Sequence, residues 1–151
     1  MEWSTHALSG ALAGYLITND WKGATVGVVA GVVPDLDEHR SKFGKMFFPI
    51  SFLMNKLFGH RTFTHSLLFV CIVWLVLCIF ADVWISFVAA AGILAHILGD
   101  MLTGKVKLFY PVDKSIGFRI NPIFFQPIDR ITRILLLVIG LFFVFQKLML
   151  T

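Results

Sequence analysis

Two side chains near the end of one apolar stretch have the types and the spacing that bind a metal ion. His96 and Asp100 are four residues apart, so on an α-helix they share one face with their Cβ atoms about 6 Å apart. An imidazole and a carboxylate at this spacing can hold one cation together. The alternative interpretation of the pair is a buried hydrogen bond between the two side chains.

A second acidic segment, Pro34-Asp35-Leu36-Asp37, follows an earlier apolar stretch. Pro and Asp often end helices, but ending a helix does not require two carboxylates. We expect Asp35 to be a metal ligand. Asp37, on the other side of an extended turn, would orient a histidine or bridge to a second ion, which makes it a candidate catalytic residue.

The densest group of polar residues, Gly59 to Ser66, precedes the third apolar stretch. Thr62 or Thr64 can cap the helix that follows, but capping explains neither His65 nor Arg61. We expect His65 to be a metal ligand. Arg61 offers the planar donors that bind phosphate or carboxylate. His60 is a candidate general acid, or a residue that orients a ligand.

The elements that position these groups are expected to lie in lipid. The chain has 151 residues, of which 58% are hydrophobic and 15% are charged, and its mean hydropathy is +0.84. This composition excludes a soluble monomer. The net charge of +4 does not indicate nucleic-acid binding, because no soluble surface is left to display a basic groove.

The apolar segments predict an all-α membrane protein, a multi-pass bundle of four to five hydrophobic helices that forms a single integral domain over residues 1–151. The fourth segment, about 20 residues long, suits a bilayer core of about 30 Å. The first two are shorter, so crossing a thinned bilayer and dipping into it both remain open. The expected helices are 5–18, 22–34, 64–81, 83–103 and 131–149.

Two connecting segments carry patterns of their own. Apolar residues recur with the helical period over residues 46–58, which predicts an interfacial amphipathic helix that begins near Pro49. Alternation over residues 105–110 and 116–120 predicts a small β-hairpin in the second basic loop. Glycines recur at every fourth position in the first two apolar stretches, which favours close packing of two helices.

Basic residues assign the sides of the membrane. Eleven of the thirteen Lys and Arg residues lie between residues 40 and 61 or between residues 105 and 133. By the positive-inside rule both loops are cytoplasmic. In an up-and-down bundle the start of the first helix, which carries His6, then lies at the same membrane face as the other polar groups. We therefore expect a shared metal site at the cytoplasmic face of the inner membrane.

These motifs, taken together and in this order, resemble the YdjM-like family of bacterial membrane-bound metal-dependent hydrolases. The resemblance covers residues from His6 to Pro111 and rests on four segments: Thr5-His6, Gly31 to Asp37, His60-Arg61-x-x-Thr64-His65-Ser66, and Ala95-His96-x-x-x-Asp100-x-x-Thr103. That family is distantly similar to the zinc-dependent phospholipase C and single-strand nuclease group. The resemblance implies one metal site at Asp35, His65, His96 and Asp100, and a second to which His6 and Asp100 contribute. No second His-x-x-x-Asp or His-x-x-x-Glu pair follows Asp100, which argues against a third metal.

The function expected from these residues is metal-dependent hydrolysis of a phosphoester, with a lipid head group as the most accessible substrate. Mixed imidazole and carboxylate ligands suit one or two zinc ions best, with manganese or iron as alternatives. A different class of function is a non-catalytic metal-binding scaffold or a metal transport protein. Transport is disfavoured because the middles of the long apolar stretches carry no polar path.

Overall fold

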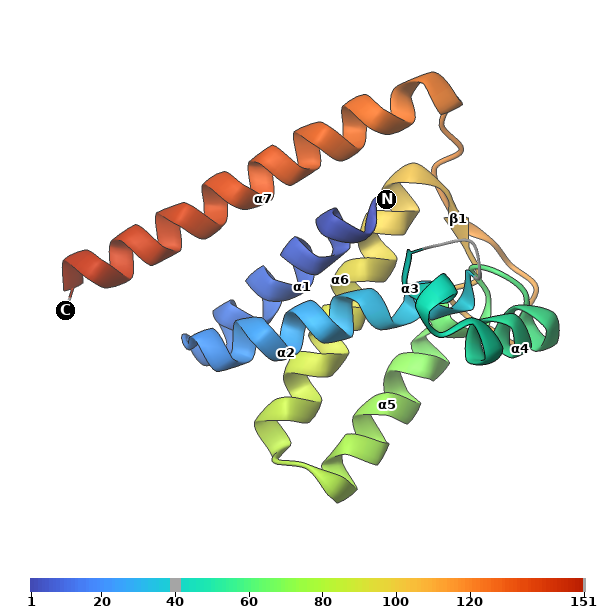
Figure 1. Ribbon diagram of the computed structural model, residues 1–151, viewed down its shortest axis with the longest axis horizontal. Coiled ribbons are helices and arrows are strands. Elements are labelled where there is room, and N and C mark those ends of the chain that lie inside the picture. Colours follow the sequence, from blue (N-terminus) through green and yellow to red (C-terminus); the bar gives the residue numbers. More distant parts are fainter. Residues whose placement is uncertain (39–41, 151) are drawn as a thin grey trace.

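Close-packed glycines join the first two helices. The computed structural model describes residues 1–38 and 42–150. In it α1 (Trp3–Thr18) and α2 (Trp21–Val32) form a hairpin (Figure 1). A Cβ atom on Gly10 would lie 2.1 Å from the carbonyl oxygen of Gly27, so the two backbones touch. The glycine spacing predicted this approach, and it is confirmed.

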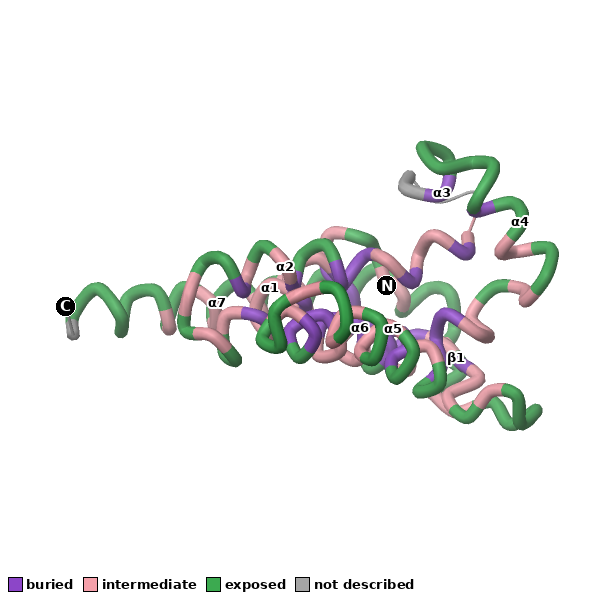
Figure 2. The backbone as a smooth tube through the Cα atoms, turned by 90° about the horizontal axis from the view of Figure 1, so that it is seen from below, coloured by how far each residue is buried: buried purple, intermediate pink, exposed green. Residues whose placement is uncertain are grey.

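The helix that carries His96 packs against this hairpin. α5 (Leu67–Phe80) and α6 (Val83–Thr103) form a second hairpin, and α6 contacts α1, α2 and α5. Its buried side chains include Val88 and Ile93, which belong to the core. Figure 2 shows the buried residues concentrated where these helices cross. α6 is therefore the element around which the molecule is built.

Short elements occupy the end of the bundle where α2 and α6 end. The first polar loop contains the 3₁₀ turn η1 (Val33–Asp37), the short helix α3 (Lys42–Met46), the helix α4 (Phe48–Phe58) and the 3₁₀ turn η2 (Phe63–His65). A helix over the predicted amphipathic segment is thus confirmed. Large apolar side chains on it, such as Ile50 and Leu57, are exposed.

The predicted β-hairpin exists, but it is shorter than expected. β1 (Lys105–Val106) pairs antiparallel with β2 (Ile116–Gly117), with Val106 opposite Ile116. Gly117 has a φ of +133°, and a Cβ atom there would lie 2.1 Å from the carbonyl oxygen of Gly104. Only glycine fits this crossing, which lies at the outer end of the short ladder, where Gly117 pairs with Lys105.

Two helix starts differ from the prediction. The third apolar helix begins at Leu67 and not at residue 64, because the Ser66 hydroxyl caps it by accepting from the N–H of Phe69. The last helix, α7, spans Pro122–Leu150 and begins nine residues before the expected position 131. Pro127 inside it argued against a helix there. Contacts of its first turns with the N-terminal segment stabilise the earlier start, including the hydrogen bond of 2.8 Å from the Glu2 N–H to Asp129 Oδ1.

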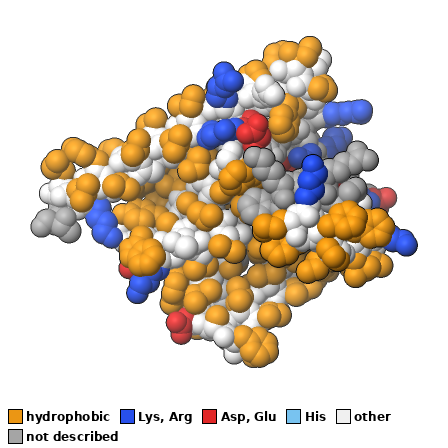
Figure 3. Space-filling model, viewed as in Figure 1, with side chains coloured by type: hydrophobic (Ala, Val, Ile, Leu, Met, Phe, Trp, Pro, Cys, Tyr) orange, Lys and Arg blue, Asp and Glu red, His pale blue; other side chains and the backbone are white. Residues whose placement is uncertain are grey.

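Length and apolar composition single out one helix among the described residues as able to cross a membrane, the 21-residue α6. α5 is also apolar but is shorter, with 14 residues. Hydrophobic side chains cover most of the face seen in Figure 3. On α7 they include Leu141 and Phe142, with 67% and 62% of their surface exposed, which is typical of a surface that contacts lipid.

Candidate metal centre

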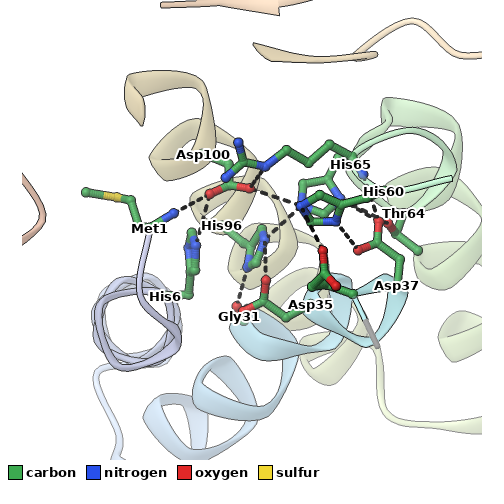
Figure 4. A network of polar contacts seen from close by, with 12 residues as sticks. Met1, His6, Gly31, Asp35, Asp37, His60, Thr64, His65, His96 and Asp100 are labelled. Atoms are coloured by element: carbon green, nitrogen blue, oxygen red, sulfur yellow. Dashed lines mark hydrogen bonds and ion pairs between the residues drawn. The ribbon is translucent and has the colours of Figure 1, made fainter. Parts of the chain in front are cut away.

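Five imidazole and carboxylate side chains from distant parts of the chain meet at one end of the bundle (Figure 4). We call them the His–Asp cluster. His6 comes from the first turn of α1, Asp35 from η1, His65 from η2, and His96 and Asp100 from the last turns of α6. The four histidine and aspartate side chains other than Asp35 are at most 1% exposed. The sequence predicted that these five residues would lie together, and the structure brings them together.

The orientation of His96 is fixed by the end of α2. Its Nδ1 lies 2.7 Å from the carbonyl oxygen of Gly31, which can only accept, so Nδ1 carries the hydrogen. Its Nε2 therefore presents a lone pair, and it points at Nε2 of His65 from 3.1 Å. The ring of His6 stacks on that of His96 with 3.7 Å between the centroids.

His65 is oriented in the same way by Asp37 and Thr64. The Thr64 hydroxyl donates to Asp37 Oδ2 at 2.5 Å, so its oxygen can accept from Nδ1 of His65, which is 2.9 Å away. Asp37 Oδ2 is a second acceptor, 3.3 Å from this nitrogen. Nδ1 thus carries the hydrogen, and Nε2 of a neutral His65 also presents a lone pair. That Nε2 lies 3.2 Å from Asp100 Oδ2.

Asp37 is the centre of a separate hydrogen-bond network behind the cluster. It is 1% exposed and accepts from His60 Nδ1 at 2.8 Å and from the Arg61 N–H at 3.0 Å, besides Thr64. Burial alone would raise its pKa, but the hydrogen bonds from His60 and His65 and their charges hold the pKa well below its usual value. Asp37 therefore stays ionised and joins η1 to residues 60–65.

The two residues of the His–Asp cluster that lie outside α1 and α6, His65 and Asp35, have shifted pKa values. Burial would lower the pKa of His65, but hydrogen bonds to Asp100 and Asp37 and their negative charges raise it to about 9. Burial raises the pKa of Asp35. The space between Asp37 and Asp100 thus favours a positive charge, which is the electrostatic condition for a cation site.

Two separations between ligand atoms match those of a tetrahedral zinc site. Zinc bonds of about 2.0–2.1 Å to nitrogen and oxygen place neighbouring ligand atoms about 3.3 Å apart. The distances from His65 Nε2 to His96 Nε2 and to Asp100 Oδ2, 3.1 and 3.2 Å, match this value. Asp35 Oδ1 lies 3.8 Å from His96 Nε2, close enough to complete the set after a small movement.

His6 adds a second group of ligand atoms. One ligand atom from each of His6, His96 and Asp100 lies within 4.8 Å of the others. Within the described residues neither ring nitrogen of His6 makes a hydrogen bond of ordinary geometry, although its Nε2 is 3.2 Å from Asp100 Oδ1. A buried imidazole with unused nitrogens is costly, and a nearby cation would remove that cost.

Arg61 lies at the border between the cluster and the surface. Its Nε is 2.8 Å from Asp100 Oδ2, and 25% of its side chain is exposed. Its backbone has a φ of +59°, unusual for a residue with a side chain. A Cβ atom on Gly104 would lie 2.2 Å from the guanidinium nitrogen Nη1, so glycine at that position makes room for Arg61.

Two participants were not found from the sequence. The amino group of Met1 lies 2.5 Å from Asp100 Oδ1 and 3.4 Å from the hydroxyl of Thr103, and no sequence pattern indicates this contact. Thr64 was assigned to helix capping, whereas its hydroxyl binds Asp37. The motif Thr64-His65 was the available signal, because a hydroxyl next to a ligand histidine can bond to the carboxylate that orients the ring.

Comparison with known proteins identifies the family. Residues 1–150 match the model of the YdjM inner membrane protein family, so the chain belongs to this family. It is 37% identical over 90 residues to the uncharacterized protein YvsG of Bacillus subtilis (strain 168). The match covers 58% of this chain and 56% of YvsG, so it spans about half the length of that relative. No solved structure matches the chain.

Proposed function

We propose that this member of the YdjM inner membrane protein family is a membrane-bound metal-dependent hydrolase that acts on a phosphoester such as a lipid head group. One observation carries the proposal. The Nε2 atoms of His65 and His96 face each other from 3.1 Å, each ring giving its hydrogen at Nδ1 to another acceptor, with a carboxylate oxygen 3.2 Å away. When His65 is neutral, the two lone pairs and the carboxylate repel one another unless a cation lies between them. Without a cation, the raised pKa of His65, about 9, puts the additional proton on this ring, so a cation would bind by replacing that proton.

The ligands divide into two sets in this proposal. Asp35, His65, His96 and Asp100 would hold one divalent cation, and His6 with the other oxygen of Asp100 would contribute to a second. Asp100 can serve both because its Oδ2 faces His65 and its Oδ1 faces His6. Imidazole and carboxylate ligands in a four-coordinate site suit zinc best.

The remaining polar residues have distinct tasks. When bound, a divalent cation would lower the pKa of a coordinated water toward neutrality and so supply a nucleophile. Arg61, one quarter exposed beside Asp100, would bind the phosphate of the substrate. His60, with 35% of its side chain exposed and its Nδ1 fixed by Asp37, would give a proton to the leaving group. Asp37 would orient His65 and His60.

The placement in the membrane is part of the proposal. α6 would cross the bilayer together with α5 and the apolar part of α7, and the His–Asp cluster would lie at the cytoplasmic face. The basic residues of the two loops around the cluster support this side. A site at that depth would meet lipid head groups before any soluble phosphoester.

The test compares Asp100→Asn with Asp113→Asn. Both remove one carboxylate charge, but Asp113 is exposed and pairs, among the residues that the structure describes, with Lys107 alone. Purified in detergent, the wild type and Asp113→Asn should contain zinc by elemental analysis and hydrolyse bis-p-nitrophenyl phosphate or phosphatidylglycerol. Asp100→Asn should lose both.

Two results would contradict the proposal in different ways. Stoichiometric metal without hydrolysis above the Asp100→Asn background would indicate the alternative function, a metal-binding scaffold. Absence of metal from the wild type after gentle purification in zinc-containing buffer would indicate a purely structural hydrogen-bond network.

A further inference from the structure

An open cleft adjoins the His–Asp cluster on the side where α7 begins. Its inner wall includes Arg61 and Thr103, and its outer wall includes Ile120, Ile123, Phe125 and Gln126. The cleft has a volume of about 800 Å³, within the size range of small-molecule sites. None of the five cluster residues lines the cleft, but Arg61, which contacts Asp100, does.

Both inner residues connect the cleft to the cluster. Arg61 Nε lies 2.8 Å from Asp100 Oδ2. The Thr103 hydroxyl lies 3.4 Å from the Met1 amino group, which contacts Asp100 Oδ1. A molecule bound in the cleft would therefore have one end within reach of the guanidinium beside the cluster.

The residues that line the cleft suit an amphipathic ligand. Arg61 is the one charged residue that lines it, so it suits a ligand with a single anionic group. The residues of the opposite wall are Ile120, Pro122, Ile123, Phe125, Gln126 and Pro127, of which Gln126 has the one polar side chain. Two exposed aromatic residues, Phe118 and Phe124, are close in sequence to Ile120 and Ile123; 67% and 58% of their surface is exposed. A nucleotide with several phosphates would need more cations, whereas a phospholipid has one phosphodiester and apolar chains.

We propose that this cleft binds a membrane phospholipid, with its phosphodiester at Arg61 and the beginning of its acyl chains along Ile123 and Phe125. The inference rests on the proposed function, because the cleft would bind the substrate of the proposed hydrolytic site and admit it to that site. Binding itself requires neither metal nor turnover.

Photo-crosslinking of the full chain tests the binding. The probe is phosphatidylglycerol with a diazirine in one acyl chain, and the reference is diacylglycerol with the same chains, both in detergent micelles. Mass spectrometry should find about tenfold more label on residues 120–127 with the phospholipid than with diacylglycerol, because a charge-assisted bond to Arg61 holds it there. Labelling of residues 134–145 should be equal for the two lipids.

Variants separate the cleft from general contact with lipid. Arg61→Ala should reduce phospholipid labelling of residues 120–127 to the diacylglycerol level. Phe125→Ser should reduce it several-fold, whereas Phe124→Ser, which changes the exposed neighbour outside the lining, should not. Because Phe125→Ser leaves Arg61 and the cluster intact, it keeps the test valid if Arg61→Ala does not fold.

Equal labelling with both lipids, or equal effects of the two Phe substitutions, would overturn the inference. If bis-p-nitrophenyl phosphate is hydrolysed but the cleft is not labelled, the proposed function stands and a soluble substrate is indicated. If the cleft is labelled but nothing is hydrolysed, the lipid site stands and the proposed function fails.

Discussion

The α1–α2 interface joins two consecutive helices by backbone contact, whereas the His–Asp cluster joins distant segments by buried polar side chains. At the interface Gly10 and Gly27 bring two backbones into contact without any charged side chain. In the cluster buried imidazoles and carboxylates meet, although burying such groups is costly unless they are paired. The interface is explained by packing alone, whereas the cluster has a composition that packing does not require. This difference is why the cluster, and not the interface, is the candidate functional region.

Filling the glycine interface should have the largest effect on stability. In Gly27→Leu the new Cβ atom would lie 2.1 Å from the carbonyl oxygen of Gly10, so α1 must move away from α2. We expect a loss of about 3 kcal/mol in the free energy of unfolding, measured by circular dichroism on heating in detergent. Gly140→Leu is the matched control, because a Cβ atom there meets nothing within 4 Å. Equal melting temperatures for the two variants would mean that the helices are not in backbone contact.

Removal of metal should destabilise the protein through the cluster alone. At a free zinc concentration about 100 times Kd, binding stabilises the folded state by about 2.7 kcal/mol. A chelator should therefore lower the melting temperature of the wild type and of Asp113→Asn, but not that of Asp100→Asn. If the wild type melts at the same temperature with and without chelator, the cluster is a hydrogen-bond network that binds no stabilising metal.

Asp37→Asn should weaken metal binding without removing a ligand. The amide replaces the ionised acceptor that faces His60, Thr64 and His65, so His65 is no longer held in the tautomer that presents Nε2. Loss of such an orienting carboxylate typically lowers metal affinity by about 10–100-fold. Competition with a chromogenic chelator measures the affinity. Hydrolysis at saturating zinc should be largely restored, and an unrestored rate would indicate that Asp37 acts directly in catalysis.

The two regions also differ in how far the sequence predicted them. Glycine spacing is a local pattern, so the contact of Gly10 with Gly27 followed from it directly. The five cluster residues were predicted because polar groups at the ends of apolar helices must meet at one face. Their partners were not predicted, because the Gly31 carbonyl and the Met1 amino group carry no residue-type signal.

The predicted helix boundaries were wrong where tertiary contacts override local sequence preference. The last helix was expected to begin at residue 131, but α7 begins at Pro122. Arg133 in its fourth turn binds Glu2 at 2.6 Å, and Asp129 binds the Glu2 N–H. These contacts join residues more than 120 positions apart, which no local pattern can indicate.

Thr64→Val should have the smallest effect, and it tests whether the network around Asp37 supports the cluster. The substitution keeps the shape of the side chain and removes the hydroxyl that donates to Asp37 Oδ2 and lies 2.9 Å from His65 Nδ1. Asp37 retains its bonds from His60 and the Arg61 N–H, so His65 loses one of its two orienting acceptors and keeps the other. We expect zinc affinity to fall about fivefold, corresponding to about 1 kcal/mol. Thr64→Ser, which restores the hydroxyl without the methyl group, should bind zinc like the wild type. If both variants weaken binding equally, the methyl group and not the hydrogen bond positions His65, and the cluster would then depend on packing in the same way as the glycine interface.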